Sequence, residues 1–274
     1  MASRSDIRTA VRELDLHGAP LCVHSSLRSF GHMRGGANAI LHALLDEDCT
    51  VMVPTFTYMC ETGRPSGRVI ERNADWPLDP ASLGSIPTFH RRSHILSRAQ
   101  MGAIPAAVLA HAHHVRGNHP LNSFSAVGPL AHELIGEQQP LDVYAPFRAL
   151  VAHGGSVVMM GVGLTKMTLI HEAERSAGRT LFHAWAKGPD GSFIECEVGS
   201  CSGGFDNLMP CLAGVLRAYD VGQSHWLVGE ADRILAAAVA AIRTEPRITH
   251  CGSAHCTRCD SAVAGGPILK DVKR

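Results

Sequence analysis

Thr168, His171 and Glu174 lie three residues apart, directly after an apolar run and a glycine-rich turn. Residues three apart share one face of a helix, so the imidazole of His171 can contact both the hydroxyl and the carboxylate. A carboxylate beside an imidazole orients the ring and raises its basicity, as a general base requires. The alternative is a solvated, salt-bridged helix face that includes Glu172 and Arg175, and the spacing alone favours this alternative.

A second polar segment, His24-Ser-Ser-Leu-Arg-Ser29, follows another apolar run and precedes Gly35-Gly36. Hydroxyls and backbone N–H groups at a strand end or a helix N-terminus suit a phosphate or a pantetheine amide. The segment lacks both the Gly-Lys-Ser/Thr of a P-loop and the G-x-G-x-x-G of a dinucleotide site. A plain Ser/Gly-rich turn is the alternative. A third cluster, His119-Pro-x-x-Ser123-Phe124, by itself indicates only a proline turn with an N-capping serine.

Hydrolase signatures are not found. A zinc-hydrolase motif that began at His171 would need a histidine at position 175, where Arg175 stands. Gly199-Ser-Cys-Ser-Gly203 does not match the G-x-S-x-G nucleophile elbow. No cysteine is a clear nucleophile either, since Cys22 falls in a predicted buried strand and Cys60 in an irregular segment.

The nine cysteines include three near the C-terminus, Cys251, Cys256 and Cys259, at C-x4-C-x2-C spacing. A C-x2-C pair is the usual half-site for tetrahedral structural zinc, which needs four ligands. Cys201 is the best fourth ligand, because the glycines around it let the backbone turn toward a metal, and His250 and His255 are alternatives. A flexible tail with incidental free thiols is an equally open interpretation.

Short apolar runs and helical patterns alternate along the chain and must position these residues. Strands are predicted at 21–24, 50–53 and 156–160, an antiparallel pair at 181–186 and 192–198, and helices at 37–45, 146–153, from Met167, 206–217 and 231–243, with Ser5 as the N-cap of a further N-terminal helix. The stretch from Thr55 to Ser82 has little periodicity and is interpreted as a lid or a disordered excursion. These elements predict an α/β fold with a central mixed sheet flanked by helices.

Composition narrows the class of protein. Apolar residues make up 45% and the formal net charge is zero, so nothing indicates binding to nucleic acid or to an anionic membrane. The charged N-terminal segment is unlike a signal peptide, and no apolar run reaches the roughly 20 residues of a membrane span. We therefore expect one cytoplasmic domain over residues 1–274, with a cysteine-rich tail at 245–274.

The order of these motifs along the chain is also informative. It resembles the order in the aminoglycoside 3-N-acetyltransferase family, the antibiotic N-acetyltransferases whose fold is distinct from the GNAT fold. The resemblance extends from about Val23 to the C-terminus, and its motifs are His24-Ser-Ser-Leu27, Gly35-Gly36, Val53-Pro-Thr-Phe-Thr57, Gly84-Ser-Ile-Pro87, His119-Pro-x-x-Ser-Phe124, Gly161-Val-Gly163, Thr168-x-x-His-x-x-Glu174 and Gly199-Ser-Cys-Ser-Gly-Gly-Phe205.

The resemblance implies acetyl transfer from acetyl-CoA to the 3-amine of a 2-deoxystreptamine aminoglycoside, with no acetyl-enzyme. It implies that His171 and Glu174 are the catalytic pair, assisted by Thr168, and that the coenzyme side comprises Ser25, Ser26, Leu27, Ser29, Ser123 and Phe124. A polycationic substrate also needs acidic walls, for which the candidates are Glu174 and the lid residues Glu61, Glu71, Asp75 and Asp79. Tyr58 of the same lid is a further candidate for substrate binding. Acetylation of another amine, an inactive coenzyme A-binding module and a zinc-stabilised interaction protein are the alternatives.

Overall fold

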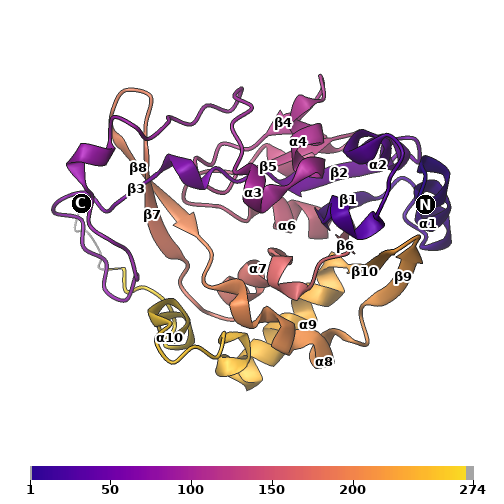
Figure 1. Cartoon of the computed structure of the whole chain (residues 1–274). Helices are drawn as coiled ribbons and strands as arrows, with labels where there is room; N and C mark the ends of the chain where they lie inside the picture. The colour runs from indigo at the N-terminus through magenta and orange to yellow at the C-terminus, as the bar shows by residue number, and fades with distance from the viewer. Residues whose placement is uncertain (1, 270–274) are drawn as a thin grey trace.

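The computed structural model describes residues 2–269 and contains a large and a small β-sheet (Figure 1). The strands in this described part of the chain are β1 (Pro20–Ser25), β2 (Thr50–Pro54), β3 (Glu61–Thr62), β4 (Val115–Arg116), β5 (Phe124–Val127), β6 (Ser156–Met160), β7 (Phe182–Lys187), β8 (Phe193–Val198), β9 (Arg217–Val221) and β10 (Ser224–Glu230). The α-helices are α1 (Arg4–Glu13), α2 (Gly36–Leu45), α3 (Arg98–Met101), α4 (Ala103–Ala110), α5 (Ala131–Ile135), α6 (Ala145–Ala152), α7 (Leu169–Ser176), α8 (Met209–Leu212), α9 (Ala231–Thr244) and α10 (Thr257–Val263). Within residues 2–269, no helix is long and apolar enough to cross a membrane.

The large sheet has seven strands in the order β4-β5-β2-β1-β6-β10-β9. Its centre is parallel, since β1 pairs in parallel with both β2 and β6, and the outer strands pair antiparallel. The mixed α/β fold predicted from the sequence is therefore confirmed.

Helices cover both faces of this sheet, which explains why its central strands β1, β2 and β6 are buried along almost their whole length and are mostly apolar. Along β1, Leu21 and Val23 pack with α1 and α2 into one core, whereas Cys22 packs into the opposite core. Met52 and Phe124 also belong to this second core, which includes side chains of α5, α6, α7 and α9. The result is three layers, with the sheet in the middle.

The antiparallel pair predicted in the second half forms as β7 and β8, but in a separate three-stranded sheet with β3. In Figure 1 this small sheet and α10 lie at the end of the molecule opposite α1. β3 comes from the Thr55–Ser82 stretch, so part of the predicted lid is a strand. The pairing itself was predicted, whereas local sequence does not reveal which sheet a hairpin joins.

Two local predictions are wrong. The N-cap of α1 is Ser3, whose side chain accepts a hydrogen bond from the backbone of Asp6, so the helix begins before Ser5. The helix predicted over 206–217 is a 3-10 turn, Ser202–Leu208, followed by the four-residue α8, and β9 begins at Arg217. Strand β10 was missed, although Trp226 and Val228 alternate with more exposed residues as a half-buried strand does.

Candidate active site

A cavity of about 340 Å³ lies beyond the carboxyl ends of the three parallel strands. β1 contributes His24 and Ser25, the segment after β2 contributes Phe56, and the segment after β6 contributes Val162. This edge is where α/β sheets bind ligands, because the parallel strands end together and the following loops diverge. Helix α7 adds His171 to the wall, and Thr168 at its N-cap position lines the cavity as well. The side chain of Thr168 makes no capping hydrogen bond, so its hydroxyl stays available to a ligand.

His171 and Glu174 form a buried pair. The Nδ1 atom of His171 lies 2.8 Å from Oε2 of Glu174, and the two residues are 8% and 2% exposed. An ionised carboxylate only accepts hydrogen bonds, so Nδ1 carries the proton in neutral His171. Nε2 then presents its lone pair as a base. The predicted i, i+3 contact is thus present, although its surroundings are a buried cavity wall and not a solvated face.

Glu174 is held at both oxygens. Ser200 donates its hydroxyl to Oε2 at 2.6 Å, and Arg179 donates to Oε1 at 2.6 Å and also to the hydroxyl of Thr249. Burial alone would raise the pKa of Glu174, but the hydrogen bonds from His171 and Ser200 and the charge of Arg179 lower it overall. Glu174 is therefore an anion with a fixed orientation. It lies behind His171 and not in the cavity wall, so its predicted direct contact with a substrate is not supported.

The ring of His171 is clamped by three neighbours. Tyr144 stacks on it with an interplanar angle of 10°, and Phe205 meets it edge-on at 4.8 Å between ring centroids. A Cβ atom at Gly199 would come within 2.6 Å of the His171 ring, so only glycine fits there. Sequence reasoning did not identify Tyr144 or Ser200, whose roles depend on contacts with residues remote in the chain.

His24 is the other imidazole in the wall, and its environment differs. Burial, and secondarily the charge of Lys166, lowers the pKa of His24 to about 3. Its Nε2 atom lies near the Cys22 thiol, and no carboxylate among the described residues hydrogen-bonds its ring. His24 is therefore a neutral polar wall, which leaves His171 as the candidate base.

Of the predicted coenzyme residues in the first loop, Ser25 lines the cavity, while Ser26, Leu27 and Ser29 lie outside its wall. The Ser29 hydroxyl is engaged with the Ser26 carbonyl and, at 2.7 Å, with the hydroxyl of Ser224. The Ser29 side chain packs directly against Gly161, since a Cβ atom on Gly161 would come within 2.1 Å of it. This packing holds Ser29 outside the cavity wall.

Ser123 and Phe124 are fully buried, so the structure does not bring these two predicted coenzyme residues to the cavity wall. The Ser123 hydroxyl accepts a hydrogen bond from Arg116 at 3.0 Å and donates to the carbonyl of Thr55. Phe124 packs in the core against Phe147. This cluster reaches the cavity through Leu121 and Asn122 instead.

Of the substrate residues predicted in the lid, two line the cavity and the others do not. Tyr58 and Glu61 line the cavity. Asp75 forms an ion pair with Arg64 at 3.0 Å, and the Asp79 side chain accepts from the backbone of Ala81, so neither reaches the cavity. Both were chosen for charge alone, which does not specify direction.

Burial raises the pKa of Glu61 to about 7, and the positive charge of Arg258 opposes that shift. Among the described lining residues, Glu61 is the one carboxylate, and Lys166 and Arg258 are cations. Arg258 packs its guanidinium 4.9 Å from the ring centroid of Phe182. Sequence reasoning missed both cations.

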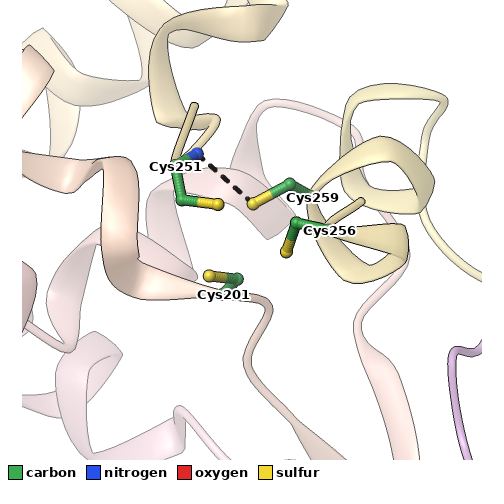
Figure 2. Close-up of side chains that lie close together, drawn as sticks. All are labelled: Cys201, Cys251, Cys256 and Cys259. Atoms are coloured by element: carbon green, nitrogen blue, oxygen red, sulfur yellow. Dashed lines mark hydrogen bonds between the residues drawn. The ribbon is translucent and has the colours of Figure 1, made fainter. Parts of the chain in front are cut away.

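A candidate metal centre lies next to this site. The Sγ atoms of Cys201, Cys251, Cys256 and Cys259 all lie within 4.8 Å of one another and point toward a common centre (Figure 2). Ligands in a tetrahedron with Zn–S bonds of about 2.3 Å would be about 3.8 Å apart, a spacing that falls within this limit. The structure thus brings Cys201 to the three C-terminal cysteines, as predicted. His250 is engaged elsewhere, since its Nε2 faces Asp260 at 3.2 Å.

Similar proteins carry the same fold. Residues 22–195 match the family model described as aminoglycoside 3-N-acetyltransferase. Aminoglycoside N(3)-acetyltransferase IX of Micromonospora chalcea is 32% identical over 183 residues, which cover 64% of this chain and 62% of that protein. Aminoglycoside N(3)-acetyltransferase VIII of Streptomyces fradiae is 30% identical over 185 residues, 61% of this chain and 59% of that protein. The match thus spans about three fifths of each relative.

Solved structures extend the likeness of fold to most of the chain. The apoenzyme of aminoglycoside acetyltransferase AAC(3)-IVa superposes with a TM-score of 0.75 at 20% identity, covering 96% of this chain and 98% of that one. A mutant of the same enzyme in complex with a gentamicin gives 0.70 at 21% identity, covering 96% and 97%. The binary structure of AAC-IIIb with CoASH gives 0.70 at 22% identity, covering 89% and 97%. With the family model matching well over half of its residues, this chain belongs to the aminoglycoside 3-N-acetyltransferase family.

Proposed function

We propose that this protein transfers the acetyl group of acetyl-CoA directly to the 3-amine of a 2-deoxystreptamine aminoglycoside and so confers resistance. The observation that carries this proposal is the His171–Glu174 pair at 2.8 Å, with His171 in the wall of a cavity at the sheet's carboxyl edge. Family membership and the coenzyme A and gentamicin named for the related structures support it. The enzyme is expected to act in the cytoplasm, because this compartment supplies acetyl-CoA and keeps free cysteines reduced.

His171 acts as the general base. At neutral pH an aminoglycoside amine is largely protonated and cannot attack a thioester, so Nε2 of His171 accepts its proton. The amine nitrogen then bonds to the acetyl carbon and releases a second proton to solvent, the carbon–sulfur bond breaks, and the proton held by His171 passes to the departing thiolate. Glu174 stabilises the charge that His171 acquires, and Thr168 donates its hydroxyl to the developing oxyanion. Each contribution is about a few kcal/mol.

The coenzyme and the acceptor approach His171 from different parts of the wall. Ser25 at the end of β1 and Lys166 in the turn after β6 both line the cavity, and a hydroxyl and an ammonium suit the amide and phosphate groups of acetyl-CoA. Tyr58 and Glu61 face the cavity from the Thr55–Ser82 segment, where a carboxylate can hold an ammonium group of the acceptor.

Release of free thiol from acetyl-CoA tests the proposal, with a panel of 2-deoxystreptamine antibiotics as acceptors. Turnover with at least one of them is expected, with the acetyl group on the 3-amine by NMR of the product. His171→Ala should lose turnover and retain coenzyme binding, while the exposed His153→Ala should behave as wild type. A folded sample that binds acetyl-CoA and acetylates nothing would instead be an inactive coenzyme-binding protein.

A second candidate function is acetylation of a less cationic amine. It is favoured by the cavity wall, in which one described carboxylate, Glu61, faces two cations, Lys166 and Arg258. A polycationic antibiotic gains little electrostatic attraction from such a wall, and the two cations repel a monoamine less strongly than they repel a polycation. The same thiol assay with small monoamines and diamines separates the two, since the preferred class has the higher kcat/KM.

We also propose that the four cysteines bind structural zinc. Four thiolates complete a tetrahedron and leave no open position for catalysis. The backbone N–H of Cys251 donates to Sγ of Cys259 at 3.4 Å, a contact that stabilises a thiolate ligand (Figure 2). Metal analysis should find one zinc per chain. Absence of zinc, together with normal folding of Cys256→Ser, would refute this assignment.

A further inference from the structure

The four cysteines lie beside the residues that hold Glu174. Cys201 directly follows Ser200, and Cys251 lies two residues after Thr249. Ser200 donates to Oε2 of Glu174, and Thr249 accepts from Arg179, which donates to Oε1 of the same carboxylate. Each oxygen of Glu174 is thus supported from a segment that ends in a cluster cysteine.

Neither segment has regular structure that would fix it independently. Ser200 precedes the 3-10 turn at Ser202–Leu208, and Thr249 ends another at Pro246–Thr249. The two segments pack directly on each other, since a Cβ at Gly204 would come within 2.4 Å of the His250 backbone. Short 3-10 turns have weak intrinsic stability, so their relative position depends on contacts such as the cysteine cluster.

The remaining two cysteines belong to α10. Cys256 is its N-cap and Cys259 lies in its first turn, and between them Arg258 reaches the cavity wall. A seven-residue helix is not stable in isolation, so α10 needs an anchor. The cluster is therefore the point at which three separate segments, bearing Ser200, Thr249 and Arg258, are joined next to the cavity.

We infer that the zinc-bound cysteine cluster positions the His171–Glu174 pair, with Ser200 as the positioning residue through which it acts. This inference rests on the proposed function only for its kinetic test. Loss of the cluster leaves Ser25 in place on the strand side of the cavity, because Ser25 belongs to β1, which is held by its pairing with β6 and not by the three joined segments. It therefore lowers kcat while acetyl-CoA binding persists.

The first test compares Cys256→Ser with Cys211→Ser, an exposed cysteine outside the cluster. Cys256→Ser should lose zinc and at least tenfold in kcat, with the acetyl-CoA Kd changed less than about threefold. Cys211→Ser should match wild type, and Cys256→His, which keeps a zinc ligand, should recover most of the loss. Loss of zinc without loss of kcat would overturn the inference.

A double-mutant cycle tests the route through Ser200. Ser200→Ala should retain zinc and lose about tenfold in kcat, as expected for one hydrogen bond to a charged group. In the Ser200→Ala background, Cys256→Ser should cost much less than it does in wild type, because the contact is already gone. Fully additive losses would show that the cluster does not act through Ser200.

A spectroscopic readout is independent of turnover. The Nδ1 proton of His171, held between the ring and Glu174, should give a downfield proton NMR resonance that is absent from His171→Asn. The resonance should weaken or vanish in Cys256→Ser and persist in Cys211→Ser. If Cys256→Ser does not fold, zinc is removed from the wild-type protein with a chelator and then restored. A resonance unchanged by zinc removal refutes positioning, whereas absence of turnover with any acceptor refutes only the proposed function.

Discussion

Replacing Glu174 with glutamine should disable the candidate base while leaving the fold intact. Glu174 accepts hydrogen bonds from His171 and Ser200 at one oxygen and from Arg179 at the other. Glutamine has one oxygen and one NH2 group, and its oxygen must face Arg179, which can only donate. Its NH2 group then faces Nδ1 of His171. The imidazole must accept there, and its proton moves to Nε2, the nitrogen needed as a base.

The magnitude follows from this change of tautomer. General-base catalysis contributes about 10²- to 10⁴-fold, or about 3–5 kcal/mol, so kcat of Glu174→Gln should fall by that factor. Arg179 loses a buried counter-charge but keeps Thr249 and the Pro246 carbonyl as acceptors. Breaking a buried ion pair typically costs about 3–5 kcal/mol. The free energy of unfolding of Glu174→Gln should therefore fall by less than this amount.

The pH dependence of stability provides a second check on Glu174. Its folded-state pKa is lowered, so its ionised form stabilises the fold above the ordinary carboxyl pKa, and this contribution is lost as pH falls through the folded pKa. Wild type should accordingly lose Tm on acidification more steeply than Glu174→Gln does.

The assay is thiol release under saturating substrates, with calorimetric titration of acetyl-CoA as a binding control. Glu172→Gln is the matched variant, because Glu172 is buried on the same helix but pairs with Arg175 and does not line the cavity. It should retain near-wild-type kcat. Glu174 does not set the tautomer of His171 if Glu174→Gln keeps more than half of wild-type kcat, or if both variants lose activity equally.

Three further predictions concern the cavity and the buried polar cluster. Because Glu61 has a pKa of about 7, it is neutral below that pH, so the Kd of a cationic acceptor should rise as pH falls from 8 to 6. Glu61→Gln should bind weakly at pH 8 and show less of this pH dependence, and identical profiles would exclude Glu61 as the contact. Gly199→Ala should lower kcat by pressing on the His171 ring, whereas Gly214→Ala, whose Cβ meets no atom within 4 Å, should not; equal kcat values would contradict this. Ser123→Ala should lower the free energy of unfolding by about 1–3 kcal/mol without changing the KM for acetyl-CoA, and a raised KM with unchanged Tm would reverse our placement of Ser123.

The sequence alone determined the local elements and their order. Three apolar strands, the helix that follows Gly163 and the β7–β8 hairpin were predictable, because burial on both faces and turn residues leave a periodic pattern. The i, i+3 spacing likewise predicted the His171–Glu174 contact, which depends only on the geometry of one helix. The C-x2-C spacing identified half of the cysteine cluster for the same local reason.

The tertiary structure decided which residues meet. Ser200 and Thr249 converge on Glu174 from 26 and 75 residues away in the chain, and no local pattern encodes such convergence. Within one motif it also decided direction, since Asn122 faces the cavity while the next residue, Ser123, is buried. Local spacing fixes contacts within one helix or turn, whereas packing between elements determines which side chains reach the cavity and which complete the cysteine cluster.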